Sequence, residues 1–369
     1  MGAAFGEEQQ ELARVARRWF SERLPSAELR RVIDLPEGFD RAHWDEMAAM
    51  GWQAMLIPEE YGGAGFGHLE AAVLIEEMGR ALDPTPYLFS AVLAADLLLT
   101  GGSDAHKESL LPGIADGTRI VVPAVTETTG EWEPAGVATE AVAADDGWVI
   151  TGTKRYVAHG HVADDYLVAA RTGDEVSWFV VPAGAAERRR LDALDLTRAL
   201  ADVRFDGVEV PGDARLPAAG EDLLERAVKV GSVALAVEQV GLAQRCLDMA
   251  VAYAKERHQF GRPIGSFQAV KHTCADMLVQ AESARAAASA AAVALAAGDD
   301  ELDELAPLAK SYCSEAALFC AGENIQVHGG IGFTWEHDAH LYFRRAKSTQ
   351  LMFGDPAHHR RLLADRIGL

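Results

Sequence analysis

Two stretches of helical periodicity, joined by a short glycine-bearing turn, constrain this chain more than any other feature. Apolar side chains recur at three- and four-residue steps over residues 235–253 and again over residues 270–281. This spacing places them on one face of a helix. Two glycines and a proline lie between the runs, at residues 261–265, and these residue types end helices. The sequence therefore predicts two long helices joined by a corner at residues 256–272.

The corner is positively charged, because Arg257, His258 and Arg262 lie within it. Positive charge is favourable near a helix C-terminus, so one interpretation is a capped helix hairpin with solvated arginines. The same side chains can bind an anion. A second glycine-bearing stretch, Q-V-H-G-G-I-G-F-T at residues 326–334, lies near the far end of the next helical pair.

The combination of R-x-Q-F-G with Q-x-x-G-G-x-G-F, in this order and at this separation, resembles the acyl-CoA dehydrogenase family. In that family the two motifs hold the ADP half of an FAD that is bound mainly by the neighbouring subunit. The resemblance therefore implies FAD as cofactor and six cofactor-binding residues: Arg257, Gln259, Phe260, Gln326, Gly329 and Gly330. Guanidinium and amide groups are suitable donors to a pyrophosphate, and glycines let backbone approach closely.

The periodicity of the chain changes twice. It is helical up to about residue 117, alternating from residue 119, and helical again from residue 223. This order predicts an α+β fold with an N-terminal helical domain, a middle β-sandwich or barrel domain and a C-terminal four-helix bundle. We expect the boundaries to be 1–118, 119–216 and 217–369. The resembled family has the same three-part architecture.

Individual elements follow from the same patterns. Strands are predicted at residues 120–125, 148–151, 166–170, 177–181 and 203–210, with a hairpin turn at Asp146-Gly147. The run Arg188–Arg190 is expected to be an exposed loop of the β domain. Four bundle helices are predicted at residues 223–257, 267–297, 302–326 and 337–367.

Composition excludes several classes of partner. The formal net charge of −22 argues against nucleic acid or an anionic membrane, since both require a basic surface. The first eight residues have neither a basic nor an apolar segment, so no secretory signal is expected. The most apolar run, residues 286–297, is too short to cross a bilayer. We therefore expect a soluble, cytoplasmic protein.

Metal and nucleophile chemistry are not supported by the sequence. All four cysteines fall in apolar helical patterns and are expected to be buried thiols: Cys246, Cys274, Cys313 and Cys320. Six histidines form three close pairs, which we interpret as solvated or capping side chains rather than metal ligands: His159/His161, His337/His340 and His358/His359. No G-x-S-x-G nucleophile motif occurs.

The family's catalytic base is the position at which the chain departs most from the resemblance. In the family a glutamate follows the R-x-A-K motif and removes a thioester α-proton. A gapless count between Arg344 and Arg360 places Phe353 at that position, so the usual base is absent. Asp355 could act only if the loop is re-registered, and the catalytic residue is therefore unknown.

A second known position for the base, on the first bundle helix, is also without a carboxylate. The corresponding residue is Gly231, followed by Ser232. Glu238 lies two turns further along the same helix, and we expect it to make a helix-surface or interhelical contact.

The middle domain has diverged as well. The family's flavin-contacting loop corresponds to residues 126–133, where its serine is missing and Glu131 and Glu133 add negative charge. The W-I-T element beside the flavin ring corresponds to Tyr156-Val-Ala158, which lacks the threonine hydroxyl. The resemblance therefore implies that positions for the chain's own flavin are replaced, whereas those that would reach a neighbour's flavin are retained.

Three functions remain open on these residues. The first is a non-catalytic subunit of an acyl-CoA dehydrogenase, an oxidoreductase acting on a CH–CH bond, in a heterotetramer with a homologous catalytic subunit. Its substrate would be an acyl-CoA thioester from fatty-acid, lipid or steroid side-chain degradation. The second is a complete flavoenzyme of other chemistry, a monooxygenase or an aspartate-based oxidase. The third is a flavin-free binding or scaffold protein.

Overall fold

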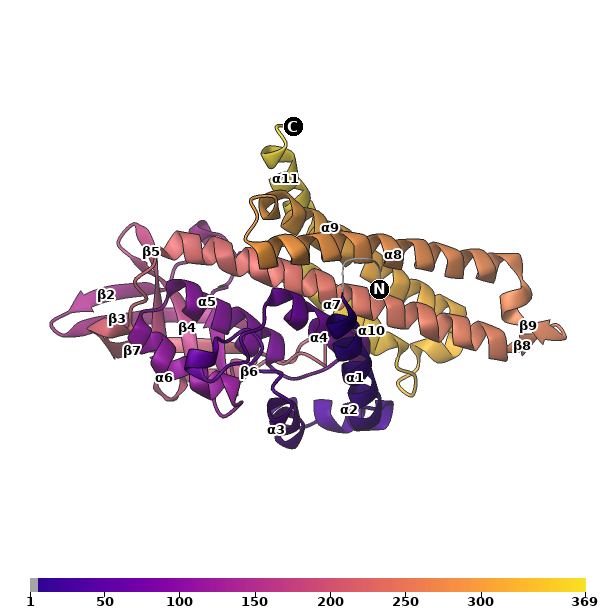
Figure 1. Ribbon diagram of the computed structural model, residues 1–369, viewed down its shortest axis with the longest axis horizontal. Helices are drawn as coiled ribbons and strands as arrows, with labels where there is room; N and C mark the ends of the chain where they lie inside the picture. The colour runs from indigo at the N-terminus through magenta and orange to yellow at the C-terminus, as the bar shows by residue number, and fades with distance from the viewer. Residues whose placement is uncertain (1–5) are drawn as a thin grey trace.

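The computed structural model describes residues 6–369. Figure 1 shows an elongated molecule in which the β domain lies at one end and the C-terminal helices run along the length. The N-terminal helices pack against one side of both. This arrangement confirms the predicted α+β fold with its helical, β and helical parts. The prediction that no secretory signal is present falls partly on residues 1–5, which lie outside the described residues.

The N-terminal part is helical, as predicted. The helices are α1 (Glu7–Arg23), α2 (Ser26–Ile33), α3 (Arg41–Ala49), α4 (His68–Ala81), α5 (Ala95–Gly101) and α6 (Asp104–Ala115). A π-helical segment, Leu88–Ala94, precedes α5, and all seven of its residues are buried. π-Helical turns often occur at functional sites because they redirect side chains.

The N-terminal part is fixed to the C-terminal helices by a close helix crossing. Helix α4 meets helix α7 (Gly220–Glu256) at two glycines. A Cβ on Gly241 would lie 1.9 Å from the carbonyl oxygen of Glu76, and one on Gly79 would lie 2.1 Å from that of Glu238. The two backbones therefore touch, which only glycine permits at this distance.

The middle part is a seven-stranded sheet with the strand order β1-β4-β2-β3-β7-β6, in which β5 pairs with β4. The strands are β1 (Val121–Ala124), β2 (Glu140–Ala144), β3 (Gly147–Ala158), β4 (Asp165–Thr172), β5 (Glu175–Pro182), β6 (Glu187–Arg190) and β7 (Leu200–Pro211). All five predicted strands are present. The predicted hairpin also forms, but its turn lies one residue earlier, because Ala144 pairs with Gly147.

One prediction for this domain is wrong. The run Arg188–Arg190 is not a loop but most of strand β6, which pairs with β7 through Arg188↔Val203 and its neighbours. The strand lies at the edge of the sheet, where charged side chains face solvent and discourage further pairing. The strand was not predicted, because its charged residues show no alternation of apolar and polar side chains.

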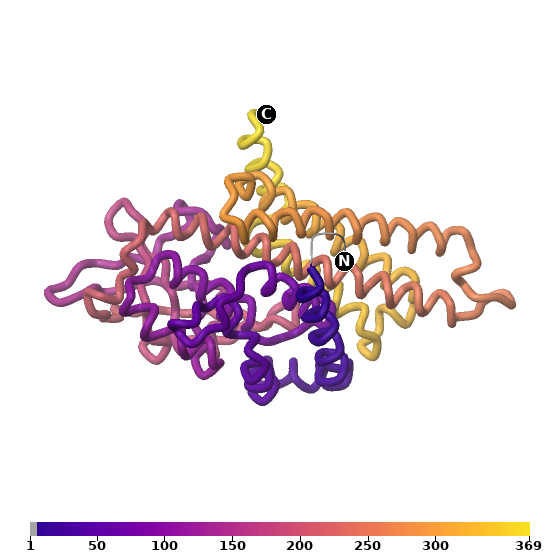
Figure 2. Tube along the Cα trace, viewed as in Figure 1, coloured from indigo at the N-terminus to yellow at the C-terminus, as the bar shows by residue number. Residues whose placement is uncertain are grey.

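The C-terminal part is the predicted helical bundle, with one difference. Its helices are α7, α8 (Gln268–Ala297), α9 (Leu302–His328), α10 (Ala339–Leu351) and α11 (Pro356–Arg366). The expected single helix at residues 337–367 is therefore two helices. Phe353 and Gly354 both have positive φ, and Pro356 begins α11, so the chain turns sharply at this point. The separate course of α11 is visible in Figure 2.

Four charged side chains meet in the interior, and we call them the buried ion cluster: Asp195, Arg198, Glu238 and Arg345. None is more than 4% exposed. Arg198 donates to Glu238 at 2.6 Å, while Arg345 pairs with Glu238 and, at 2.9 Å, with Asp195. Arg345 also donates to the carbonyl of Asp83 at 3.1 Å. The cluster thus joins the N-terminal part, the β domain and the bundle.

Three of the four cysteines are buried thiols, as predicted, but Cys274 is only partly buried. Within residues 6–369, no helix is long and apolar enough to span a membrane. Nor do the described residues contain a group of three or more His, Cys, Asp or Glu side chains that could hold a metal ion.

Candidate functional site

The structure brings the two glycine-bearing motifs to the same end of the bundle. Helices α7 and α9 both end there, and the ring of Tyr253 stacks on that of His328 with centroids 4.4 Å apart. Tyr253 lies one turn before Arg257, whose backbone N–H caps the helix on the Tyr253 carbonyl at 2.8 Å. His328 lies between Gln326 and Gly329 in sequence. The motifs are therefore neighbours in space, although about seventy residues separate them.

The corner itself is a small β-hairpin. Strands β8 (His258–Gln259) and β9 (Arg262–Pro263) pair through Gln259↔Arg262. Between them Phe260 has a φ of 53° and Gly261 a φ of 76°, which together make the tight turn. The hairpin projects beyond the bundle at the right of Figure 1.

All six residues with a predicted cofactor role lie on the surface of the chain: Arg257, Gln259, Phe260, Gln326, Gly329 and Gly330. The Phe260 ring is 91% exposed, and two further aromatic side chains beside the second motif, Phe333 and Trp335, are 76% and 61% exposed. No carboxylate within residues 6–369 forms an ion pair with Arg257 or Arg262. These basic groups therefore remain available to an anionic ligand.

Gly329 shows why the second motif needs glycine. It ends α9 with φ 62° and ψ −138°. This combination is essentially restricted to glycine, because a Cβ would clash with the backbone. The turn leaves Gly329 and Gly330 without side chains at the exposed end of the helix, where a ligand can approach the main chain.

The candidate catalytic positions lie elsewhere in the molecule, and they contact each other. Phe353 is 0% exposed, and its ring packs onto Gly231 of α7. A Cβ on Gly231 would lie only 2.4 Å from the nearest ring atom. The two positions at which the resemblance places a carboxylate in other proteins are thus adjacent in this fold. Here one is the phenylalanine Phe353 and the other is the glycine Gly231, so neither carries a carboxylate.

Two further aromatic side chains enclose the Phe353 ring. Trp132 lies 4.2 Å away between ring centroids, and Phe89 of the π-helical segment lies 6.4 Å away and nearly parallel, with 14° between the planes. We call Phe89, Trp132, Gly231 and Phe353 the Phe353 cluster. The cluster was not predicted, because it joins residues from four distant parts of the sequence.

Asp355, the remaining carboxylate candidate for a base, is exposed and caps helix α11. Its side chain accepts the backbone N–H of His358 at 2.7 Å. This bond lowers the pKa of Asp355, because it stabilises the ionised carboxylate. A capping carboxylate with a lowered pKa is a weaker proton acceptor than a free one.

The loop expected beside the chain's own flavin is held by internal contacts. Glu127 accepts a hydrogen bond from buried Lys154 at 2.7 Å and from the backbone N–H groups of Ala138 and Thr139. Burial lowers the pKa of Lys154 to about 8, although the Glu127 carboxylate opposes the shift. Glu133 lies 3.4 Å from His358, so this loop also contacts the start of α11.

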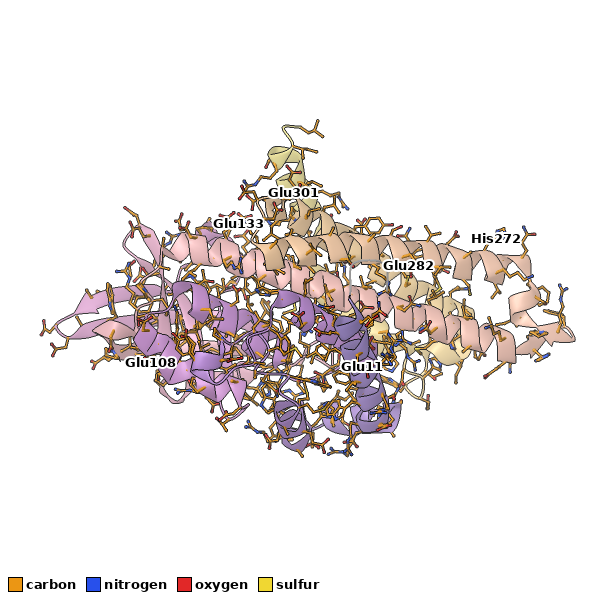
Figure 3. The ribbon with its side chains drawn as sticks, in the orientation of Figure 1. Glu11, Glu108, Glu133, His272, Glu282 and Glu301 are labelled. Carbon is orange, nitrogen blue, oxygen red and sulfur yellow. The ribbon has the colours of Figure 1, made fainter. Side chains whose placement is uncertain are left out.

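The loop and the corner are far apart along the bundle. Figure 3 labels Glu133 in this loop and His272 near the start of α8, and the two lie at well-separated positions along the long axis.

In the W-I-T-like element, Tyr156 is 44% exposed with a φ of 58°, whereas Ala158 is 4% exposed.

Of the expectations about polar side chains, one is confirmed and one needs correction. Glu238 makes an interhelical contact, with Arg345 of α10, which was one of the two expected roles, and it is buried rather than on the helix surface. Burial alone would raise the pKa of Glu238, yet the neighbouring arginines hold it below its ordinary value. His159 and His359 are neither solvated nor capping, since they are only 1% and 2% exposed. Burial holds the pKa of His159 well below its ordinary value.

Three consecutive segments of the sequence match the three domains of one protein family. These are the acyl-CoA dehydrogenase N-terminal domain at residues 6–118, the middle domain at 123–208 and the C-terminal domain at 219–368. An acyl-CoA dehydrogenase of Mycolicibacterium smegmatis named IpdE2 is 34% identical over 340 residues, covering 92% of each protein. The chain belongs to the acyl-CoA dehydrogenase family.

Two similar solved structures cover nearly the whole of this chain. The ChsE4-ChsE5 complex from Mycobacterium tuberculosis contains a chain that is 30% identical, with a TM-score of 0.91 over 100% of this chain and 99% of that chain. The butyryl-CoA dehydrogenase of Megasphaera elsdenii is 25% identical, with a TM-score of 0.93 over 100% of both chains. The acyl-CoA dehydrogenase fold is that of an FAD-dependent flavoprotein.

The residues of the corner suit the flavin cofactor of the acyl-CoA dehydrogenases. Unpaired basic groups, an exposed ring and glycine backbone lie together where the phosphates of a dinucleotide could be held. The Phe353 cluster differs, since none of its four members has a charged side chain.

Proposed function

We propose that this chain is the non-catalytic subunit of a hetero-oligomeric acyl-CoA dehydrogenase, in which its corner completes the FAD site of a homologous catalytic subunit. The observation that carries the proposal is the contact between Phe353 and Gly231. Removal of a thioester α-proton requires a positioned base, and both positions for that base hold uncharged groups. The partner is therefore expected to supply the carboxylate.

The chain's own residues have a binding role in this scheme. Arg257 and Gln326 donate hydrogen bonds to phosphate oxygens, and Phe260 presents a ring face to the same ligand. Gly329 and Gly330 allow the ligand to reach backbone N–H groups. The flavin held there would supply a hydride acceptor for the β-carbon of the thioester.

Two of the similar solved structures support a heteromeric assembly. One is the ChsE4-ChsE5 complex, and another is a Tcur3481-Tcur3483 steroid acyl-CoA dehydrogenase variant that is 31% identical to this chain. Each is named for two proteins. By analogy we propose a heterotetramer, acting on an acyl-CoA thioester from lipid or steroid side-chain degradation.

Substitutions in the corner test the proposal. We expect Arg257→Ala or Gln326→Ala to weaken flavin retention in the assembled oligomer, because each removes a hydrogen-bond donor without disturbing the core. The loss at Arg257 should be about 1.5–3 kcal/mol, which is typical of a bond to a charged group. It is measured as FAD bound per oligomer during dilution or dialysis.

The control for this experiment is Lys255→Ala. Lys255 is a basic, exposed residue two positions before Arg257 and lies outside both motifs. Its replacement changes the net charge equally, and flavin retention should stay at the wild-type level. If both corner variants also kept wild-type flavin content and assembly, the corner would have no cofactor role and the proposal would fail.

A further inference from the structure

Phe353 is buried in a backbone conformation that its residue type disfavours. Its φ is 58° and its side chain is 0% exposed. The left-handed region is unfavourable for residues with a Cβ, whereas glycine adopts it freely. Such strain persists only where the surrounding structure enforces it, and it often marks a functional position.

Buried donors fix the main chain on both sides of Phe353. His359 Nε2 lies 2.9 Å from the Phe353 carbonyl oxygen, and Lys310 Nζ donates to the carbonyls of Gln350 and Gly354 at 3.1 Å each. Burial lowers the pKa of Lys310 to about 7 and that of His359 to about 3. These bonds determine where the ring points, although none of them involves the ring.

The ring lies between two aromatic side chains and a residue with no side chain. Trp132 is 4.2 Å from it, Phe89 lies parallel to it on another side, and Gly231 leaves room for it on the surface of α7. We call the volume that the ring fills the Phe353 slot. Phe89, Trp132 and Gly231 present apolar surface on these sides, and the ring that fills the slot is flat.

We propose that the Phe353 slot is a site for a flat apolar group, which the chain keeps closed with its own side chain. This inference rests on the proposed function, in which the slot lies where a catalytic relative carries its base, beside the reacting thioester. The ring excludes a ligand and at the same time preserves the close packing that an empty space would lose. Without the ring, an apolar cavity of this kind stays dry and accepts a molecule the size of benzene.

Phe353→Gly in the full chain is the direct test, because glycine suits the positive φ and removes the ring. The probe is fluorobenzene, observed by fluorine NMR. We expect saturable binding to the variant that is about tenfold or more tighter than any binding to the wild-type chain. Fluoroacetate carries the same nucleus on a charged molecule and should not bind to either protein.

Tyr156→Gly is the matched control. Tyr156 also has a φ of 58° and an aromatic ring, but the side chain is 44% exposed, so its removal opens no interior space. It should gain no fluorobenzene binding. Binding to Tyr156→Gly equal to that of Phe353→Gly would show that the probe does not report the slot.

Gly231→Ala provides a second, reciprocal measurement, because its methyl group competes with the ring for the slot. It should lower the Tm of the wild-type chain but leave that of the Phe353→Gly chain unchanged. The proposal is overturned if the wild-type chain binds fluorobenzene as well as the variant does. It is also overturned if folded Phe353→Gly does not bind, or if Gly231→Ala lowers both Tm values equally.

Neither measurement depends on flavin content or turnover. Failure of the slot experiments would therefore leave the flavin-retention test of the corner unaffected. Conversely, a negative flavin-retention result with positive slot binding would reject the proposed function while keeping the closed slot as a property of this chain.

Discussion

Arg345→Met should cause the largest loss of stability of any substitution considered. Arg345 is 0% exposed and pairs with both carboxylates of the buried ion cluster. Methionine keeps much of the side-chain volume but leaves Glu238 and Asp195 short of positive charge in the interior. Breaking a buried ion pair in this way costs about 3–5 kcal/mol. The free energy of unfolding, measured by urea denaturation, is the appropriate readout.

Arg344→Met is the control for that experiment. Arg344 precedes Arg345 on the same helix, is partly exposed, and donates to the carbonyl of Leu194 at 3.0 Å without a carboxylate partner. Its loss should cost about 1 kcal/mol or less. Equal destabilisation by the two substitutions would mean that the cluster contributes no more than an ordinary arginine contact.

The chain expressed alone should not dehydrogenate acyl-CoA thioesters at a useful rate. The expectation follows from Phe353, Gly231 and Ala158 together, since the first two provide no base and the third no hydroxyl beside the flavin ring. Absence of a general base typically costs about 10²–10⁴-fold in rate. Steady-state oxidation of acyl-CoA by the isolated chain and by the assembled oligomer gives the comparison.

Phe353→Glu sharpens this test. In the presence of the catalytic partner, the substitution should add little activity, because a base without an adjacent hydride acceptor completes no reaction. The expectation would be wrong if the isolated wild-type chain bound one FAD per subunit and oxidised an acyl-CoA. In that case Asp355→Asn becomes the first variant to measure.

Periodicity was sufficient to predict the order of the parts, because long helices and buried strands carry strong local signals. It did not reveal the break between α10 and α11. Gly354, Asp355 and Pro356 are residue types that end and begin helices, but the surrounding helical spacing led us to predict one continuous helix. Strand β2 was also missed, since it is short and mostly exposed, and its residues look like loop.

The corner could be predicted from the sequence, whereas the Phe353 cluster could not. The corner consists of two local motifs, each recognisable by itself, and the structure adds the Tyr253–His328 contact that joins them. The cluster depends on packing between residues as distant as Phe89, Trp132 and Phe353. Side-chain contacts of this range arise only from the tertiary fold, so no local pattern predicts them.

Helix α7 connects these two regions as one uninterrupted element of 37 residues. Gly231 near its first third and Arg257 at its end are 26 positions apart (257 − 231), which corresponds to roughly 39 Å along a helix. A substitution at one end therefore changes neither the packing nor the charge at the other. On the proposed function, the interior end of the helix can therefore lose its base while the exposed end keeps its ligand-binding residues.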